Sequence, residues 1–229
     1  MKKGAVGVLL CFAVIYLFSS IVYAEDAKLD MRIDECRELV DEIMQMPEES
    51  IPRDLLADAK GIAIFPSVIK GGFILGARYG KGVLLHRDKK TGKWSAPSFY
   101  TLAGGSWGLQ IGGQVIDLIL VITNERGMKS LLQNKFTMGA DAAVAAGPVG
   151  RNTEAATDLH LKANILSYSR SKGLFAGVTL KGAVVSPDNK ANELYYGKMV
   201  SAEEILIEGD VKPSREAKKL INTIRKYSR

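Results

Sequence analysis

The pattern most suggestive of catalysis is the segment GGSWG at residues 104–108, which matches the G-x-S-x-G nucleophile elbow of hydrolases. In such enzymes the turn exposes the serine, and an acid and then a histidine downstream complete a triad. Asp141 or Asp158, followed by His160, occur in that order. The elbow also needs a helix directly after the serine, whereas a β-branched run follows Gly108. The segment therefore indicates a glycine-rich turn in a sheet, with hydrolysis as the minor alternative.

Other residues that could do chemistry are few. The two cysteines, Cys11 and Cys36, and the two histidines, His86 and His160, show no spacing typical of zinc ligands. The glycine-rich stretch at 76–82 lacks the serine or threonine that follows the lysine of a P-loop. We therefore expect no enzyme, no bound metal and no cofactor.

Hydrophobic periodicity predicts the helices that must position any site. Apolar residues from Leu29 to Ile43 recur every three or four residues and predict a helix that ends before Pro47. Cys36 lies on its apolar stripe, where a buried small hydrophobe is expected. Further helices are expected at 52–59, at 124–133, after the capping box that begins at Ser201, and from Ser214 onward.

Between these helices, residues 61–180 are rich in glycine and favour short strands. The expected strands are 61–65, 72–78, 82–86, 94–102, 110–122 and 173–180, with a hairpin loop at 88–93. Glycine weakens strands, so its frequency indicates bends of a strongly coiled sheet. Asp117 interrupts an apolar run, as expected of a solvent-facing strand position. The predicted fold class is α+β: an antiparallel glycine-rich sheet curled toward a barrel or sandwich, with N-terminal and C-terminal helices packed on it.

Composition and charge narrow the function. The chain has 229 residues, 47% hydrophobic and 24% charged, which is typical of globular proteins and argues against disorder or a fibre. The net charge of +6 is uneven, because residues 25–50 hold ten acids and three bases while the rest of the chain is basic. An acidic leader on a basic body suggests self-association, docking within the chain, or simply an acidic helix face in water. The bases are scattered and form no nucleic-acid motif, so nucleic acid is not an expected partner.

Residues 1–24 have the organisation of a secretory signal peptide. Lys2 and Lys3 precede an apolar run at 5–18, and small residues lead up to Ala24. We expect cleavage after Ala24 and export, most simply to a periplasm, with the mature protein peripheral at a membrane. The alternative is an uncleaved anchor, because the segment is about 20 residues long and could span a bilayer.

Several segments in one order resemble the SYLF domain family. They are GIAIFP at 61–66, WSAPSFY at 94–100, GADAAVAAGPVGR at 139–151, YSRSKGLFAG at 168–177 and NELYYG at 192–197. The resemblance runs from about Ala59 to Leu206. It implies a noncatalytic lipid-binding module: eukaryotic relatives bind phosphoinositides and some bind or bundle actin, whereas the bacterial type, to which this chain is similar, is a small exported protein.

The helix before the domain departs from the family pattern. Membrane binding in the eukaryotic relatives depends on a basic amphipathic segment there. The corresponding residues of this chain are largely acidic: Asp30, Asp34, Glu35, Glu38, Asp41 and Glu42. Phosphoinositide recognition by that route is therefore not expected. Actin is not an expected partner either, since an exported protein would not meet it in its own cell.

The candidate headgroup contacts are basic residues in two groups. The first group lies beside glycine-rich strands, where a phosphate could approach the backbone: Arg78, Lys81, Arg170 and Lys172. The second group lies on a basic amphipathic C-terminal helix: Lys218, Lys219, Arg225 and Lys226. That helix either lies in a membrane interface or packs its apolar stripe on the domain with its lysines in water, and the sequence leaves both open.

The sequence thus divides into a signal peptide (1–24), an acidic helical segment (25–58), a SYLF-like domain (59–209) and a basic amphipathic helix (210–229). Our first interpretation is a noncatalytic lipid- or membrane-surface-binding protein of the cell envelope, with anionic phospholipid as its partner. The alternative is a structural or protein-interaction module that self-associates as a homo-oligomer through the acidic leader and the basic body.

Overall fold

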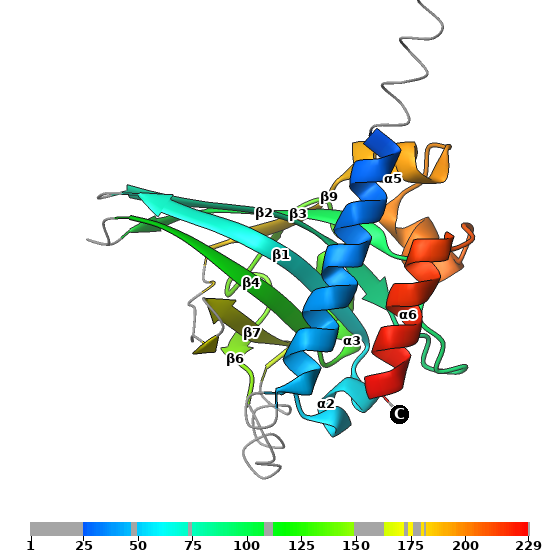
Figure 1. Ribbon diagram of the computed structural model, residues 1–229, viewed down its shortest axis with the longest axis horizontal. Coiled ribbons are helices and arrows are strands. Elements are labelled where there is room, and N and C mark those ends of the chain that lie inside the picture. Colours follow the sequence, from blue (N-terminus) through cyan, green and yellow to red (C-terminus); the bar gives the residue numbers. More distant parts are fainter. Residues whose placement is uncertain are drawn as a thin grey trace, which may run out of the picture.

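One curled sheet with helices packed against it forms the protein (Figure 1). The computed structural model describes residues 25–46, 50–72, 75–107, 112–148, 163–171, 174–175, 180 and 182–228. Its sheet is antiparallel throughout except where β6 (Val144–Ala146) pairs with β7 (Ile165–Ser171). The prediction of an α+β fold with a curled antiparallel sheet and terminal helices packed on it is therefore confirmed.

The strands at the centre of the sheet are long, and the edges are short. The remaining strands are β1 (Gly61–Gly72), β2 (Leu75–His86), β3 (Ser98–Trp107), β4 (Gly112–Ile122), β5 (Phe136–Thr137), β8 (Leu174–Phe175) and β9 (Val184–Pro187). They lie in the order β5-β9-β3-β2-β1-β4-β7-β6, and β8 pairs with β7.

Two strand predictions were wrong in detail. Residues 75–78 and 82–86, expected in two separate strands, belong to the single strand β2, whereas Gly72 ends β1. The strands β5, β6, β7 and β9 were not predicted. The loop at 88–93 does form a hairpin connection, because Arg87 and Trp94 pair as a bridge around it. Most of the strand expected at 173–180 lies outside the described residues.

The helices agree more closely with their prediction. They are the N-terminal helix (residues 25–45), α2 (Arg53–Asp58), α3 (Glu125–Leu132), α5 (Asn189–Tyr196), the π-helix η1 (Glu204–Glu208) and α6 (Arg215–Tyr227). The predicted capping box is present: Ser201 N–H donates to Glu204 Oε2 at 2.6 Å, and Glu204 N–H donates to Ser201 Oγ at 3.2 Å. Ser214 caps α6 by accepting from Ala217 N–H at 3.1 Å. Helix α5 was not predicted.

The sheet separates two apolar cores. On one face, the N-terminal helix and α6 lie side by side across the strands, and their apolar stripes are buried with Ile64, Val83 and Ile119 (Figure 1). On the other face, α3 and η1 cover Phe65, Leu84 and their neighbours. The terminal helical segments therefore belong to the same folded unit as the sheet.

A β-bulge in β1 bends the centre of the sheet. One extra residue of β1 lies between Ile64 and Ile69 relative to its partners in β2, and Ser67 at the bulge has a φ of 56°. The strands approach closely here, because a Cβ on Gly82 would lie 2.0 Å from the Ile64 carbonyl oxygen. Glycine is thus required where the sheet coils, as the sequence indicated.

Candidate functional site

Beyond the bulge, the central strands extend past the helices as a projecting arm (Figure 1). We define the arm as residues 68–72, 75–81, 101–107 and 112–116, in which β4, β1, β2 and β3 lie side by side. The bases in the described arm are Lys70, Arg78 and Lys81, and the described arm contains no acid. This charge pattern differs from that of the N-terminal helix, which is mainly acidic.

One face of the arm is apolar and open to solvent. Ile69 of β1 is the register partner of both Tyr79 of β2 and Val115 of β4, so these three side chains form a row across the strands. Their exposed fractions are 59%, 49% and 54%, respectively. Strand alternation places the row on the same side of the sheet as the N-terminal helix, beyond the area that the helix covers. We call these three residues the apolar row.

The first group of predicted headgroup contacts is split between the two faces of the sheet. Lys81 is exposed, lies on the face of the apolar row, and pairs with Asp188 at 3.8 Å. Arg78 pairs in register with Lys70 on the opposite face, where it is 7% exposed. Burial lowers the pKa of the Arg78 guanidinium. Arg78 is therefore packed into the sheet. Of the two predicted contacts Arg78 and Lys81, only the Lys81 side chain reaches the surface.

Arg170 has a different environment from the one predicted. Its guanidinium donates to Asp117 Oδ2 at 2.9 Å and to Glu42 Oε2 at 2.6 Å. Burial opposes its charge, but the bonds to Glu42 and Asp117 outweigh burial and raise its pKa. Asp117 also accepts from the backbone N–H of Ser67, the bulge residue, at 3.1 Å. Arg170 thus fixes the base of the arm to the N-terminal helix, and Asp117 is a partner in this cluster rather than a purely solvent-facing residue.

Helix α6 packs its apolar stripe onto the domain. Ala217, Leu220, Ile221, Ile224 and Tyr227 are all buried. Of the two arrangements that the sequence left open, the structure shows the packed one. Only the charged side of α6 is available to a membrane.

The second group of predicted contacts lies on that charged side. All four residues are exposed, but two have acidic partners: Lys219 lies 2.5 Å from Glu216, and Lys226 lies 3.5 Å from Asp41 of the N-terminal helix. The structure brings Lys218, Lys219, Arg225 and Lys226 together, at the end of the molecule away from the arm (Figure 1). Lys172 lies outside the described residues.

Two candidate catalytic residues that the structure describes, Ser106 and Cys36, are in unsuitable positions. Ser106 lies within β3, paired with Gly76, and so is not on a strand-to-helix turn. Cys36 is fully buried, and burial raises the pKa of its thiol. Asp158 and His160 lie outside the described residues. Within the described ranges, no group of three or more His, Cys, Asp or Glu residues is placed to hold a metal ion.

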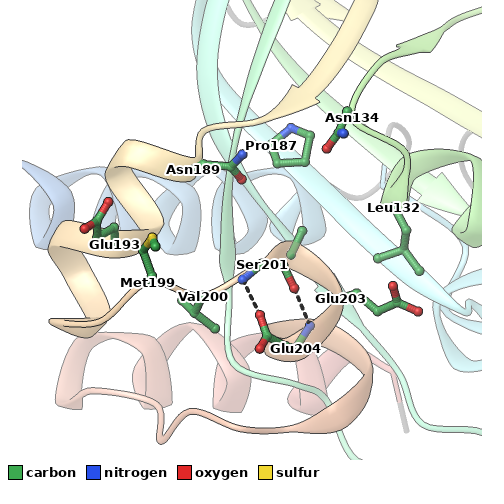
Figure 2. Close-up of a pocket in the computed structure, with 11 residues that line it drawn as sticks. Leu132, Asn134, Pro187, Asn189, Glu193, Met199, Val200, Ser201, Glu203 and Glu204 are labelled. Atoms are coloured by element: carbon green, nitrogen blue, oxygen red, sulfur yellow. Dashed lines mark hydrogen bonds between the residues drawn. The ribbon is translucent and has the colours of Figure 1, made fainter.

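An open hollow of about 470 Å³ lies between α5 and η1 (Figure 2). Leu132, Pro187, Met199 and Val200 supply apolar walls. On one side, Ser201 and Glu204 form reciprocal hydrogen bonds with each other (Figure 2). Ser201 and Glu204 therefore serve as a helix cap, and the other polar residues of the lining are Asn134, Asn189, Glu193 and Glu203.

The apolar row was missed in the sequence because the bulge changes which residues share a face. Val115 was included in an expected strand, but its exposure could not be inferred without its neighbours.

Among the described helices, none is both long and apolar enough to cross a membrane.

Comparison with known proteins agrees with the resemblance noted in the sequence. The Ysc84 family, described as "Las17-binding protein actin regulator", matches residues 103–227. The chain is 37% identical over 183 residues to SH3 domain-containing YSC84-like protein 1 of Rattus norvegicus, covering 80% of this chain and 53% of that protein. It is 37% identical over 169 residues to LAS seventeen-binding protein 3 of Saccharomyces cerevisiae, covering 72% of this chain and 36% of that protein. The chain thus spans about half or less of these relatives. It belongs to the Ysc84, or SYLF, domain family, whose members are noncatalytic binding proteins.

Proposed function

We propose that this protein is a noncatalytic module that binds anionic membrane surfaces. The observation that supports this most is the arm, whose described residues include three bases and no acid. Each basic residue close to an anionic surface contributes about 1 kcal/mol, and this contribution decreases as salt screens it. Lys70 and Lys81 are at least partly exposed, so both side chains can contribute to the binding free energy at an anionic surface.

The alternative, self-association through opposite charges, is less well supported. The acidic helix and the basic helix already meet within one chain, where Asp41 accepts from Tyr227 at 2.6 Å and lies 3.5 Å from Lys226. Glu42 likewise pairs with Arg170. Acidic and basic side chains that pair with each other inside one chain are not available to pair with a second copy.

The proposal also covers the role of residues 1–24 as a signal peptide and the compartment in which the protein acts. We propose export to a periplasm, because of the charged start, apolar run and small residues before Glu25. The description of the family refers to actin regulation and to Las17, and one relative is named LAS seventeen-binding protein 3. In a periplasm the protein would meet membranes but no actin, so we propose that its domain binds a membrane surface there.

Vesicle co-sedimentation tests the proposal. Residues 25–229, which contain all residues of both apolar cores, should bind vesicles of phosphatidylcholine with about 30% phosphatidylglycerol and should bind pure phosphatidylcholine much more weakly. Binding should fall at least tenfold between about 50 and 500 mM salt. Equal affinity for both vesicles, or no binding to either, would exclude the proposal.

The two cationic surfaces can be compared in the same assay. Lys70→Gln/Lys81→Gln changes the arm, and Lys218→Gln/Arg225→Gln makes an equal charge change on α6. Because these surfaces lie at opposite ends of the molecule, one flat bilayer contacts only one of them (Figure 1). We expect the arm variant to lose more affinity, since α6 lies beside the mainly acidic N-terminal helix, whereas the described arm contains no acid and Lys81 pairs with Asp188 at the longer distance of 3.8 Å.

A further inference from the structure

We propose that the apolar row of the arm, Ile69, Tyr79 and Val115, inserts into the boundary between the headgroups and acyl chains of an anionic bilayer. This inference rests on the proposed function and adds to it a defined surface and a depth of contact. It distinguishes a protein that only touches charged headgroups from one whose sheet face enters the apolar region.

The row is a continuous apolar surface rather than three scattered residues. The register places Ile69 directly between Tyr79 and Val115, and each of the three is about half exposed. The next positions outward on this face of β1 and β4 are Gly71 and Gly113, and a Cβ built on either would meet nothing within 4 Å. The surface around the row is therefore flat and open, which lets a bilayer approach all three side chains together.

The residues next to the row favour a lipid interface. Tyrosine has an apolar ring and a polar tip and is enriched where membrane meets water. Lys81 is two residues along β2 from Tyr79 and so projects from the same face, with an exposed side chain long enough to keep its ammonium among headgroups while its stem lies in apolar surroundings.

Charge favours an anionic bilayer over a second copy of this chain as the occupant. Two arms stacked face to face through the row would bring the Lys81 side chains of both copies toward each other, whereas Lys70 and Arg78 lie on the opposite face of each sheet and the described arm contains no acid. Like charges brought together in this way repel. An anionic bilayer instead attracts the exposed Lys81 and supplies an apolar phase for the row at once.

The test uses residues 25–229 with Ile69→Ser/Val115→Ser. Met31→Ser is the matched control, because Met31 is also a solvent-exposed apolar residue, 57% exposed, but lies on the N-terminal helix. We expect the arm variant to bind phosphatidylcholine–phosphatidylglycerol vesicles at least tenfold more weakly than the parent, and the control to stay within twofold. Both variants should keep the parent's melting temperature and circular dichroism, since surface substitutions of this kind have small effects on stability.

Depth is measured separately with Tyr79→Trp. Lipids brominated on the acyl chain should quench the added fluorescence of this variant, relative to the parent, more strongly than lipids brominated at the headgroup. Unchanged binding by Ile69→Ser/Val115→Ser, or the absence of acyl-chain quenching, would overturn the insertion.

The other outcomes separate this inference from the proposed function. If the parent binds anionic vesicles in a salt-sensitive way and the arm variants behave like the parent, surface binding stands and insertion fails. If the parent binds no vesicle, both fail. If sedimentation velocity shows a dimer that Ile69→Ser/Val115→Ser abolishes, the row contacts a second copy and the proposal is overturned.

Discussion

Removal of the Asp117 carboxylate should weaken the base of the arm more than its position on a strand would suggest. Asp117 accepts two bonds from Arg170, from Nη2 at 2.9 Å and from Nε at 3.3 Å, and one from Ser67 N–H at 3.1 Å. The Arg170 side chain is only 14% exposed, so Asp117→Ala leaves a charge with little water around it. The bond to Ser67 is solvent-accessible and contributes less.

The magnitude follows from these environments. Loss of hydrogen bonds to a charged, partly buried partner costs about 1.5–3 kcal/mol, and loss of the acceptor for Ser67 adds about 0.5 kcal/mol. We therefore expect Asp117→Ala to lower the free energy of unfolding by about 2–3 kcal/mol, or the melting temperature by about 5–10 °C. Glu42 also pairs with Arg170 but is 57% exposed. Glu42→Ala should cost about 0.5 kcal/mol.

Urea unfolding followed by circular dichroism measures both effects. A double-mutant cycle with Arg170→Ala should give a coupling to Asp117 of about 1 kcal/mol or more, because either single change breaks the same pair. If Asp117→Ala costs no more than Glu42→Ala, or if the two changes at Asp117 and Arg170 add within about 0.5 kcal/mol, the cluster does not fix the arm.

Three further predictions concern buried or half-buried polar groups. Asn192 is fully buried and its side chain accepts from Phe99 N–H at 2.7 Å, so Asn192→Leu should cost about 3 kcal/mol in urea unfolding; a cost below about 1 kcal/mol would contradict this. The buried Cys36 thiol, whose pKa is raised by burial, should resist Ellman's reagent in folded residues 25–229 and react fully in guanidinium; rapid reaction of the folded protein would contradict this. Burial lowers the pKa of His86 below its ordinary value of about 6.5, so the folded state resists protonation. Melting temperature should therefore fall as pH drops below about 6.5, and this fall should be smaller in His86→Asn.

Helices could be predicted from the sequence because their determinants are local. The 3.6-residue stripe from Leu29 to Ile43 and the caps at Ser201 and Ser214 act within a few residues, and each has its expected structure. Helix α5 was missed although it has local signals too: Asp188 caps its start by accepting from Ala191 N–H at 3.2 Å, and Gly197 ends it with a φ of 66°. Its burial, in contrast, depends on a contact at long range. Asn192 bonds with its amide to the backbone of Phe99, 93 residues away, and this contact is invisible to periodicity.

The candidate site was less predictable, because partners decide what a charged residue does. Arg170 and Lys81 are both basic residues on glycine-rich strands, yet one is held between two carboxylates and the other reaches solvent. Arg78 is buried in the sheet. Residue type alone therefore suggested four equivalent headgroup contacts, whereas for the three that the structure describes it shows three different environments.

The bulge explains why the apolar row exists and why alternation along β1 did not reveal it. Before the bulge, Ile64 faces the core beneath the N-terminal helix and Phe65 faces the opposite core. Strict alternation would then place Ile69 on the side of Phe65. The extra residue reverses the parity, so that Val68 enters that core instead and Ile69 emerges beside Tyr79 and Val115. Ser67 adopts its positive φ at this point and donates to Asp117, which Arg170 ties to the N-terminal helix. The polar cluster at the base of the arm and the exposed apolar surface beyond it are thus consequences of one inserted residue.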